Sequence, residues 1–237
     1  MKKFLALLLV VSMVLGLAAC GDGTQNNTET TEEMTEFLVE EIEESLGEEI
    51  FGGATEEIPQ AFFTGSSTGN TYWNEFIGIR CDLDLNWAFV TDNELHIQNQ
   101  TNLDVTGNDY LDNLPDSAEI YDMLAYHSNE ADGVGVTLVK LSAADLLTTE
   151  EQYLAAIKDP TVEAMAENGI TIDSAQIIKI QFAGEEHTAL TMEGGYIGYD
   201  VYEYLVAIKC DGFMACVTVC TWDENTCMDV LNQFEAY

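Results

Sequence analysis

Positive charge is scarce in this chain, which has only seven Lys and Arg side chains against 43 Asp and Glu among 237 residues. The formal net charge at pH 7 is −36. A field of this sign repels phosphate groups, so we expect neither a nucleic acid nor an anionic lipid surface as a partner. The charge favours a well-hydrated domain that attracts cations or basic partners. Beyond residue 19, the basic side chains are Arg80, Lys140, Lys158, Lys179 and Lys209.

Motifs for catalysis and cofactor binding are also scarce. No Ser-x-x-Lys, Gly-x-x-x-x-Gly-Lys or Gly-x-Gly-x-x-Gly occurs. The sequence therefore shows neither the serine-lysine motif of penicillin-binding enzymes nor a nucleotide-binding loop. The three histidines lack the paired spacing of zinc ligands. Arg80, Cys81 and His187 are the residue types of a cysteine-protease active site. However, Arg80 and Cys81 are adjacent on an expected strand, so their side chains point to opposite faces and cannot easily share a site. We therefore expect no enzyme, no catalytic residue, no metal and no cofactor.

The cysteines show no pairing pattern. Apart from Cys20, five remain, an odd number, and no Cys-x-x-Cys occurs. They lie in apolar stretches, where a thiol behaves as a small hydrophobic group, so we expect buried thiols. One disulfide is the alternative. A two-residue hairpin at Cys210–Phe213 would exclude bridges among Cys210, Cys216 and Cys220, so the possible bridges would be Cys220 with Cys227, or one that includes Cys81. The five are Cys81, Cys210, Cys216, Cys220 and Cys227.

The one long apolar run lies at the start of the chain. Lys2 and Lys3 precede an uncharged segment over residues 4–17, the pattern of a secretory signal that ends at residue 19. The following Leu17-Ala18-Ala19-Cys20 resembles the bacterial lipobox. That resemblance implies acylation of the Cys20 thiol, cleavage before Cys20, and a mature protein held by lipid on the extracytoplasmic face of the cell membrane. An ordinary signal peptide with a chance cysteine is the alternative.

An acidic linker is expected over residues 20–70. Residues 21–70 contain no Lys or Arg, and their charge favours an extended tether. The apolar residues Met34, Leu38, Ile42 and Leu46 fall on one helical stripe. This stripe indicates either a marginal helix or a helix that docks on a partner. The run Gly65–Gly69 predicts a flexible end of the linker.

A single domain is expected over residues 71–237. A capping box at Thr91 and Glu94 opens a short helix. Thr148 with Glu151 opens the main helix, which Pro160 must end or kink and Asn168-Gly169 caps. A closing helix carries Cys227, Val230, Leu231 and Phe234 on one stripe. Strands are expected at 76–83, 87–90, 120–127, 134–141, 175–182, 187–192, 202–209 and 213–221.

This order of elements predicts an α+β fold. The stretch Phe76-Ile77-Gly78-Ile79 leading to Trp87-x-Phe89, the long helix before a four-strand meander and the closing helix resemble the PsbP-like fold. Short stretches such as Tyr121-Asp122-Met123 are similar to uncharacterised lipoproteins of Gram-positive bacteria. The resemblance implies a predominantly antiparallel β-sheet flanked by helices on both faces. It also implies a binding or assembly role, since the family spans photosystem assembly proteins and a nuclear-transport GTPase binder.

The densest aromatic cluster surrounds Gly194-Gly195 and Gly198. Its tyrosines could form a stacking platform for sugar or peptide, or Tyr202 and Tyr204 could simply pack on one strand face. The candidate ligand-binding residues are Tyr196, Tyr199 and Trp73. We therefore expect a membrane-anchored, non-enzymatic binding or assembly module with a protein partner. The alternatives are a solute- or glycan-binding lipoprotein and a small cell-surface enzyme.

Overall fold

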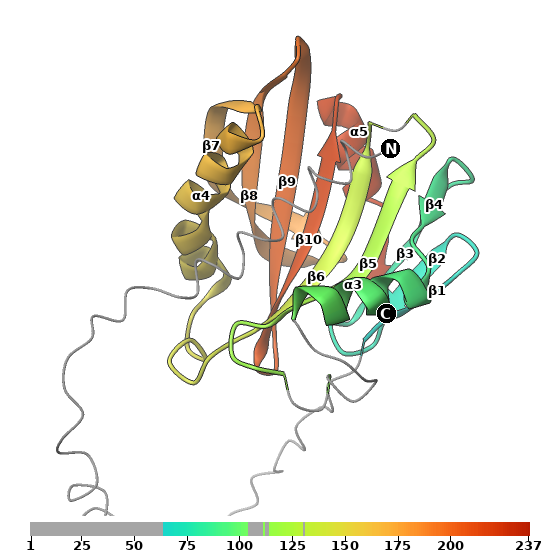
Figure 1. Ribbon diagram of the computed structural model, residues 1–237, viewed down its shortest axis with the longest axis vertical. Coiled ribbons are helices and arrows are strands. Elements are labelled where there is room, and N and C mark those ends of the chain that lie inside the picture. Colours follow the sequence, from blue (N-terminus) through green and yellow to red (C-terminus); the bar gives the residue numbers. More distant parts are fainter. Residues whose placement is uncertain (1–63, 104–110, 112–113, 130) are drawn as a thin grey trace, which may run out of the picture. The chain divides into compact units, whose positions relative to one another are not determined.

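Two antiparallel sheets and three helices make up the described part of the chain (Figure 1). The computed structural model describes residues 64–103, 111, 114–129 and 131–237. The predictions for the signal peptide, Cys20 and the 34–46 stripe lie outside these residues. The larger sheet has the order β4 (Trp87–Phe89), β5 (Glu119–His127), β6 (Gly133–Lys140), β10 (Phe213–Thr221), β9 (Tyr199–Cys210), β8 (Glu185–Tyr196), β7 (Thr171–Phe182). The smaller has the order β1 (Ser66–Thr68), β2 (Thr71–Asn74), β3 (Ile79–Asp82), β11 (Phe234–Ala236).

The central strand β10 is buried on both sides. Along it, Ala215, Val217 and Val219 belong to one cluster of buried side chains, and Met214 and Cys216 belong to another. Because side chains alternate along a strand, these clusters lie on opposite faces of the larger sheet. A strand that is apolar on both faces requires a covering layer on each.

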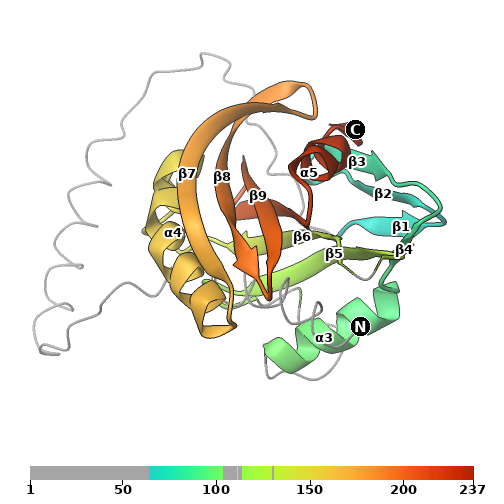
Figure 2. The same cartoon turned by 90° about the horizontal axis from the view of Figure 1, so that it is seen from above.

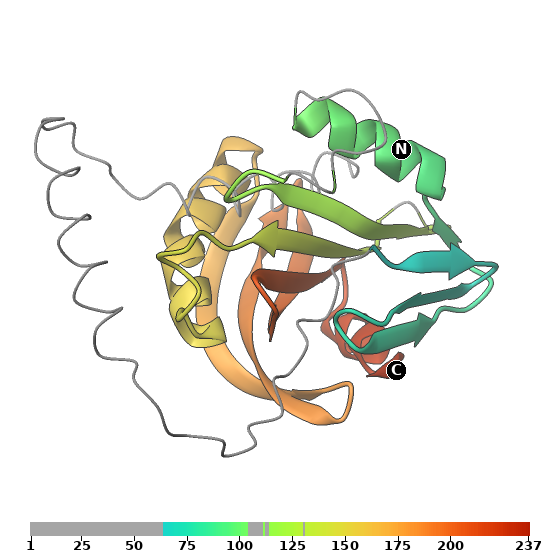
Figure 3. The same cartoon turned by 90° about the horizontal axis from the view of Figure 1, so that it is seen from below.

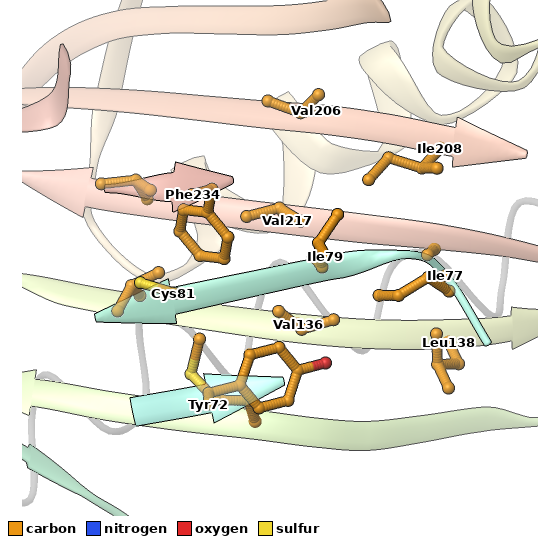
Figure 4. Close-up of a cluster of buried hydrophobic side chains, with 14 of the residues drawn as sticks. Tyr72, Ile77, Ile79, Cys81, Val136, Leu138, Val206, Ile208, Val217 and Phe234 are labelled. Atoms are coloured by element: carbon orange, nitrogen blue, oxygen red, sulfur yellow. The ribbon is translucent and has the colours of Figure 1, made fainter. Parts of the chain in front are cut away.

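The smaller sheet covers one face. Side chains of β2 and β3, among them Tyr72, Ile79 and Cys81, point onto strands of the larger sheet, and Phe234 of β11 joins them (Figure 4). Cys227, Val230 and Leu231 of α5 (Glu224–Leu231) belong to the same cluster. The core on this side is therefore built from both ends of the described chain.

Helix α4 (Glu150–Glu167) covers the other face. It packs on β7, β8 and β9, and lies on the outer side of the curve that β7 and β8 describe (Figure 2). Tyr153, Leu154, Ile157 and Met165 form its buried stripe. Helix α3 (Asp92–Asn102; green in Figure 3) lies along β5, and Asn99 bonds the backbone of Tyr121 through both ends of its amide. None of the described helices is long and apolar enough to cross a membrane.

The predicted start of α4 is wrong, and Pro160 does not end the helix. The helix is capped by Thr149 with Gln152, one residue later than Thr148 with Glu151. It also runs through Pro160 without interruption. Proline removes one backbone N–H, but Ile157 and Met165, on either side of it, are both buried against the sheet. Tertiary contacts on both sides thus hold the helix together across the proline, and the predicted cap at Asn168-Gly169 is confirmed.

Predictions at both ends of the domain also need correction. Residues 66–68 form β1, which pairs with β2, so the smaller sheet includes residues before 71 and Gly65–Gly69 is not a flexible linker end. The first predicted strand begins at Ile79, because the side-chain Oδ1 of Asn74 accepts hydrogen bonds from the backbone N–H groups of Phe76 and Ile77 and makes a turn there. At the other end, α5 stops at Leu231, and Phe234 lies in β11.

A buried carboxylate joins the two sheets. Asp122 sits where the register of β5 shifts against β6. Its Oδ2 accepts hydrogen bonds from Tyr72 Oη (2.5 Å) and Asn74 Nδ2 (2.8 Å), and its Oδ1 accepts one from Gly65 N (2.7 Å). Burial nevertheless raises the pKa of Asp122, although these bonds oppose the shift. The bulge therefore turns a polar side chain of the larger sheet toward the smaller one.

Candidate functional site

The hairpin that joins β8 to β9 ends in a strained turn. Tyr196 pairs with Tyr199 across it, and both central residues have positive φ, 50° at Ile197 and 84° at Gly198. Such turns favour Asn, Asp or Gly at the first central position. A β-branched side chain in this region is an outlier that costs energy. The Ile197 side chain is also 71% exposed, so little burial offsets the strain.

An aromatic pair lies at the base of this turn. Tyr199 is 57% exposed, and its ring centroid lies 4.1 Å from that of Trp222, with the planes tilted by 47°. Tyr196 is half-buried and packs on the α4 side of the core. We name Tyr196, Ile197, Tyr199 and Trp222 the hairpin tip. It presents one aliphatic and one aromatic side chain to solvent, held by two less exposed aromatics.

Four carboxylates lie close to the hairpin tip along the chain: Asp200 follows Tyr199 and pairs with Gly195, Asp223 and Glu224 follow Trp222, and Glu193 precedes the hairpin on β8. Glu193 lies opposite Tyr202 in the β8–β9 ladder, and Asp223 caps α5. Burial and the negative charge of these four residues raise the pKa of Tyr202. All four carboxylates are exposed. The surroundings of the hairpin tip are thus strongly negative.

The structure separates the three predicted ligand-binding residues. It brings Tyr196 and Tyr199 together as a cross-strand pair but places Trp73 on β2, opposite Ser66 and Arg80 in the smaller sheet. Instead of Trp73, the aromatic partner of Tyr199 is Trp222, which sequence reasoning missed. Its position follows from the pairing of Thr221 with Tyr202, which brings the end of β10 beside the start of β9.

A cavity of about 560 Å³ lies beside the first half of α4. Its apolar wall includes Val139, Leu141 and Ile157, and its polar wall includes Thr148 and Gln152. The volume falls within the usual range for small-molecule pockets. Two exposed leucines, Leu146 and Leu147, belong to the connection that borders it. The cavity is therefore a second candidate site.

The cysteine side chains do not form a nucleophilic site. Burial raises the pKa of the thiols of Cys81, Cys210 and Cys227 to about 12, far from the low values of reactive thiolates. All five thiols are free, and the predicted burial is confirmed for four of them, with Cys210 half-buried. Cys220 and Cys227 belong to clusters on opposite faces of the sheet, which rules out the alternative bridge between them.

The residues of the imagined cysteine constellation lie apart. Arg80 pairs with Glu235 at 2.8 Å on the exposed side of the smaller sheet, while Cys81 points into the core. His187 Nδ1 lies 2.9 Å from Glu150 Oε1, at the start of α4. The three groups therefore do not converge on one site.

A Gly-x-Ser-x-Gly spacing, which sequence reasoning overlooked, occurs at residues 65–69. In hydrolases this motif joins a strand to a helix and exposes the serine hydroxyl. Here it forms β1 and the turn into β2. Ser67 Oγ donates to Asp92 Oδ1 at 3.1 Å, a carboxylate rather than a histidine. The spacing therefore carries no nucleophile elbow.

One buried acidic side chain stands out in the larger sheet. Glu203 of β9 is 1% exposed. It lies between Val201 and Leu205 on the face of the strand that packs toward α4. Neither of its carboxylate oxygens makes a hydrogen bond of ordinary geometry. Burial raises its pKa to about 8, and the neighbouring Cys220 thiol opposes the shift only in part. The carboxyl group is therefore mostly protonated at neutral pH.

Comparisons with known proteins give structural neighbours only. No family model and no curated protein matches the chain. The solution structure of PsbP (CyanoP) from the cyanobacterium Synechocystis is similar at 11% identity, over 78% of this chain and 98% of that chain, with a TM-score of 0.43. This neighbour is a PsbP protein, the group that the sequence was expected to resemble.

A second neighbour is the crystal structure of LpqN, a protein involved in cell envelope biogenesis of Mycobacterium tuberculosis. It is similar at 12% identity over 66% of this chain and 82% of that chain, with a TM-score of 0.35. TM-scores as low as these carry no argument about what the present chain binds.

Proposed function

We propose that this chain is an extracytoplasmic lipoprotein, anchored to the membrane through Cys20, whose domain is a non-enzymatic binding or assembly module. The observation that carries the binding role is the hairpin tip, where Ile197 and Tyr199 are exposed on a turn that isoleucine strains. Exposed apolar side chains held by a rigid scaffold are typical of binding sites. The anchor is supported by Leu17-Ala18-Ala19-Cys20 after the apolar run, with the acidic residues 21–63 as the proposed tether.

Replacing Cys20 tests the anchor. We expect wild-type protein produced in a Gram-positive host to incorporate an alkyne-tagged fatty acid and to fractionate with membranes. Cys20→Ser should incorporate none and leave the membrane fraction, because stable attachment needs the acyl chains. Cys210→Ser, which changes a half-buried thiol of the domain, is the matched control and should keep the label. Unlabelled wild-type protein in the medium would contradict the anchor.

The cavity beside α4 supports a second candidate function, the binding of a small solute or glycan. A true ligand at about 100 times its dissociation constant adds about 2.7 kcal/mol to the free energy of unfolding, which raises the Tm of a domain of this size by about 5 to 10 °C. Thermal melts against a panel of sugars, amino acids and metabolites measure this shift. Ala156→Trp, which fills the cavity from the exposed side of α4, should abolish it. A panel without any shift argues against this second function.

A further inference from the structure

We propose that the hairpin tip docks a polypeptide segment that is both basic and apolar. The proposal rests on the binding role proposed above and names the class of partner. Three features of the described residues carry it: the exposed aliphatic side chain of Ile197, the supported ring of Tyr199, and the negative charge around them. Each feature selects one property of the partner.

Ile197 selects an apolar contact. The turn that it opens would be more stable with Asn, Asp or Gly at this position, as Gly198 shows at the next one. At 71% exposure the isoleucine gains little from burial within its own domain. Residues with a strained backbone that is not explained by packing within the domain are often found at functional sites. The side chain therefore fits a role that a partner completes.

Tyr199 supplies a preorganised ring. Its contact with Trp222 fixes the ring while leaving 57% of the residue exposed. Tyrosine and tryptophan are enriched among the residues that dominate binding energy, partly because few rotatable bonds must be ordered. The pair therefore provides a surface for an apolar or cationic side chain, since cations are attracted to aromatic faces.

The surrounding charge selects a basic partner. Asp200 adjoins Tyr199 and Asp223 adjoins Trp222 in the chain, Glu193 lies opposite Tyr202 in the same hairpin, and neither β8 nor α5 contains a lysine or arginine. The one lysine of β9, Lys209, lies at the far end of that strand and donates to the Leu146 carbonyl. No basic side chain of these three elements thus neutralises the tip. A Lys- or Arg-bearing segment would be attracted to this end of the hairpin.

Other segments of this chain fit less well. Residues 21–63 contain no Lys or Arg, and their carboxylates would face those around the tip. A second copy of the chain carries the same net charge of −36. Both would be repelled, because like charges across an interface cost several kcal/mol. Charge complementarity therefore favours a different polypeptide.

Three labelled hexapeptides test the proposal against the full chain: alternating Lys-Leu, alternating Lys-Ser and alternating Glu-Leu. Fluorescence anisotropy gives the affinities, and the emission of Trp222 reports contact at the tip. We expect the Lys-Leu peptide to bind at least tenfold more tightly than the Lys-Ser peptide, and the Glu-Leu peptide not to bind. The change in tryptophan emission should disappear in Trp222→Phe.

The decisive variant is Ile197→Asn, which relieves strain and removes the apolar side chain together. We expect its Tm to rise by about 2 to 4 °C, because Asn-Gly suits the turn, while its affinity for the Lys-Leu peptide falls at least tenfold. Leu85→Asn is the matched control, since Leu85 is 94% exposed in a different turn, and it should bind as the wild type does.

Several outcomes would overturn the proposal. Unchanged affinity of Ile197→Asn would show that Ile197 does not contact the peptide, and a fall in its Tm would make Ile197 a structural residue. Equal binding of the Lys-Leu and Lys-Ser peptides would leave only general charge attraction, and binding of the Glu-Leu peptide would remove the role of charge. Fatty-acid labelling of the same preparations reports on the anchor separately, so failure here leaves that test unaffected.

Discussion

Glu203→Gln is expected to be more stable than the wild type by about 4 kcal/mol at pH 8 and nearly equal to it at pH 5. The reason is that burial makes the wild-type carboxyl group keep its proton in the folded sheet, whereas in the unfolded chain it ionises freely as the pH rises. Its oxygens have no hydrogen bonds of ordinary geometry to compensate. Glutamine imitates the protonated form at every pH. Urea unfolding at pH 5, 6, 7 and 8 measures the difference in the free energy of unfolding.

The sign follows from the two pKa values of Glu203, which are near 4.5 in the unfolded chain and about 8 in the folded one. Between them only the folded state holds the proton, so the free energy of unfolding falls as the pH rises. Below this window both states are protonated, and above it both are ionised. The loss is therefore complete above about pH 8 and absent below about pH 4.5.

Glu193→Gln is the matched control for this experiment. It removes the same charge from the neighbouring strand β8, at a position that is exposed. General repulsion among the many carboxylates affects both variants alike, so only the effect of burial separates them. A Glu203→Gln variant whose stability follows the wild-type pH dependence would contradict the burial of this group.

Asp122→Ala is expected to lower the free energy of unfolding by about 3 kcal/mol. The substitution leaves Tyr72 Oη, Asn74 Nδ2 and Gly65 N without their acceptor. Each buried donor without a partner costs about 1 to 3 kcal/mol, and relief of the buried carboxyl group offsets part of the sum. Chemical unfolding followed by circular dichroism measures the loss.

Two further variants separate the loss of one hydrogen bond from the loss of a surface charge. Tyr72→Phe removes one donor and keeps the ring in the core, so we expect a loss of about 1 kcal/mol. Asp173→Ala removes an exposed carboxylate of β7 and should change stability by no more than about 0.5 kcal/mol. If Asp122→Ala proves as stable as Asp173→Ala, the bulge does not hold the two sheets together through Asp122.

Local signals explain which parts of the fold could be predicted. The Asp211-Gly212 turn fixes the β9–β10 hairpin, with φ of 72° at Gly212 and Cys210 opposite Phe213. The capping box of Thr91 with Glu94 opens α3 as predicted. Each of these signals lies within a few residues of the feature that it specifies. Sequence alone is sufficient in such places.

Long-range pairing explains what could not be predicted. Strands β1, β2, β3 and β11 have three or four residues each, too few for a clear alternation. Likewise, nothing local indicates that Trp222 contacts Tyr199, because the pairing of β9 with β10 creates that neighbourhood. Glu203 did leave a signal, a charged residue at an inward position between Val201 and Leu205, which sequence reasoning did not use.

The smaller sheet can be completed only late in protein synthesis, because β11 must be made before it can pair with β3. Arg80 of β3 meets Glu235 of β11 across 155 positions of sequence. At about 5 to 20 residues per second, a ribosome needs roughly 8 to 30 s to pass from one to the other. During that interval β3 lacks one of its neighbours and Phe234 is missing from the core. A chain threaded through an export channel from its N-terminus would therefore stay open throughout its passage, and would complete its core only on the far side.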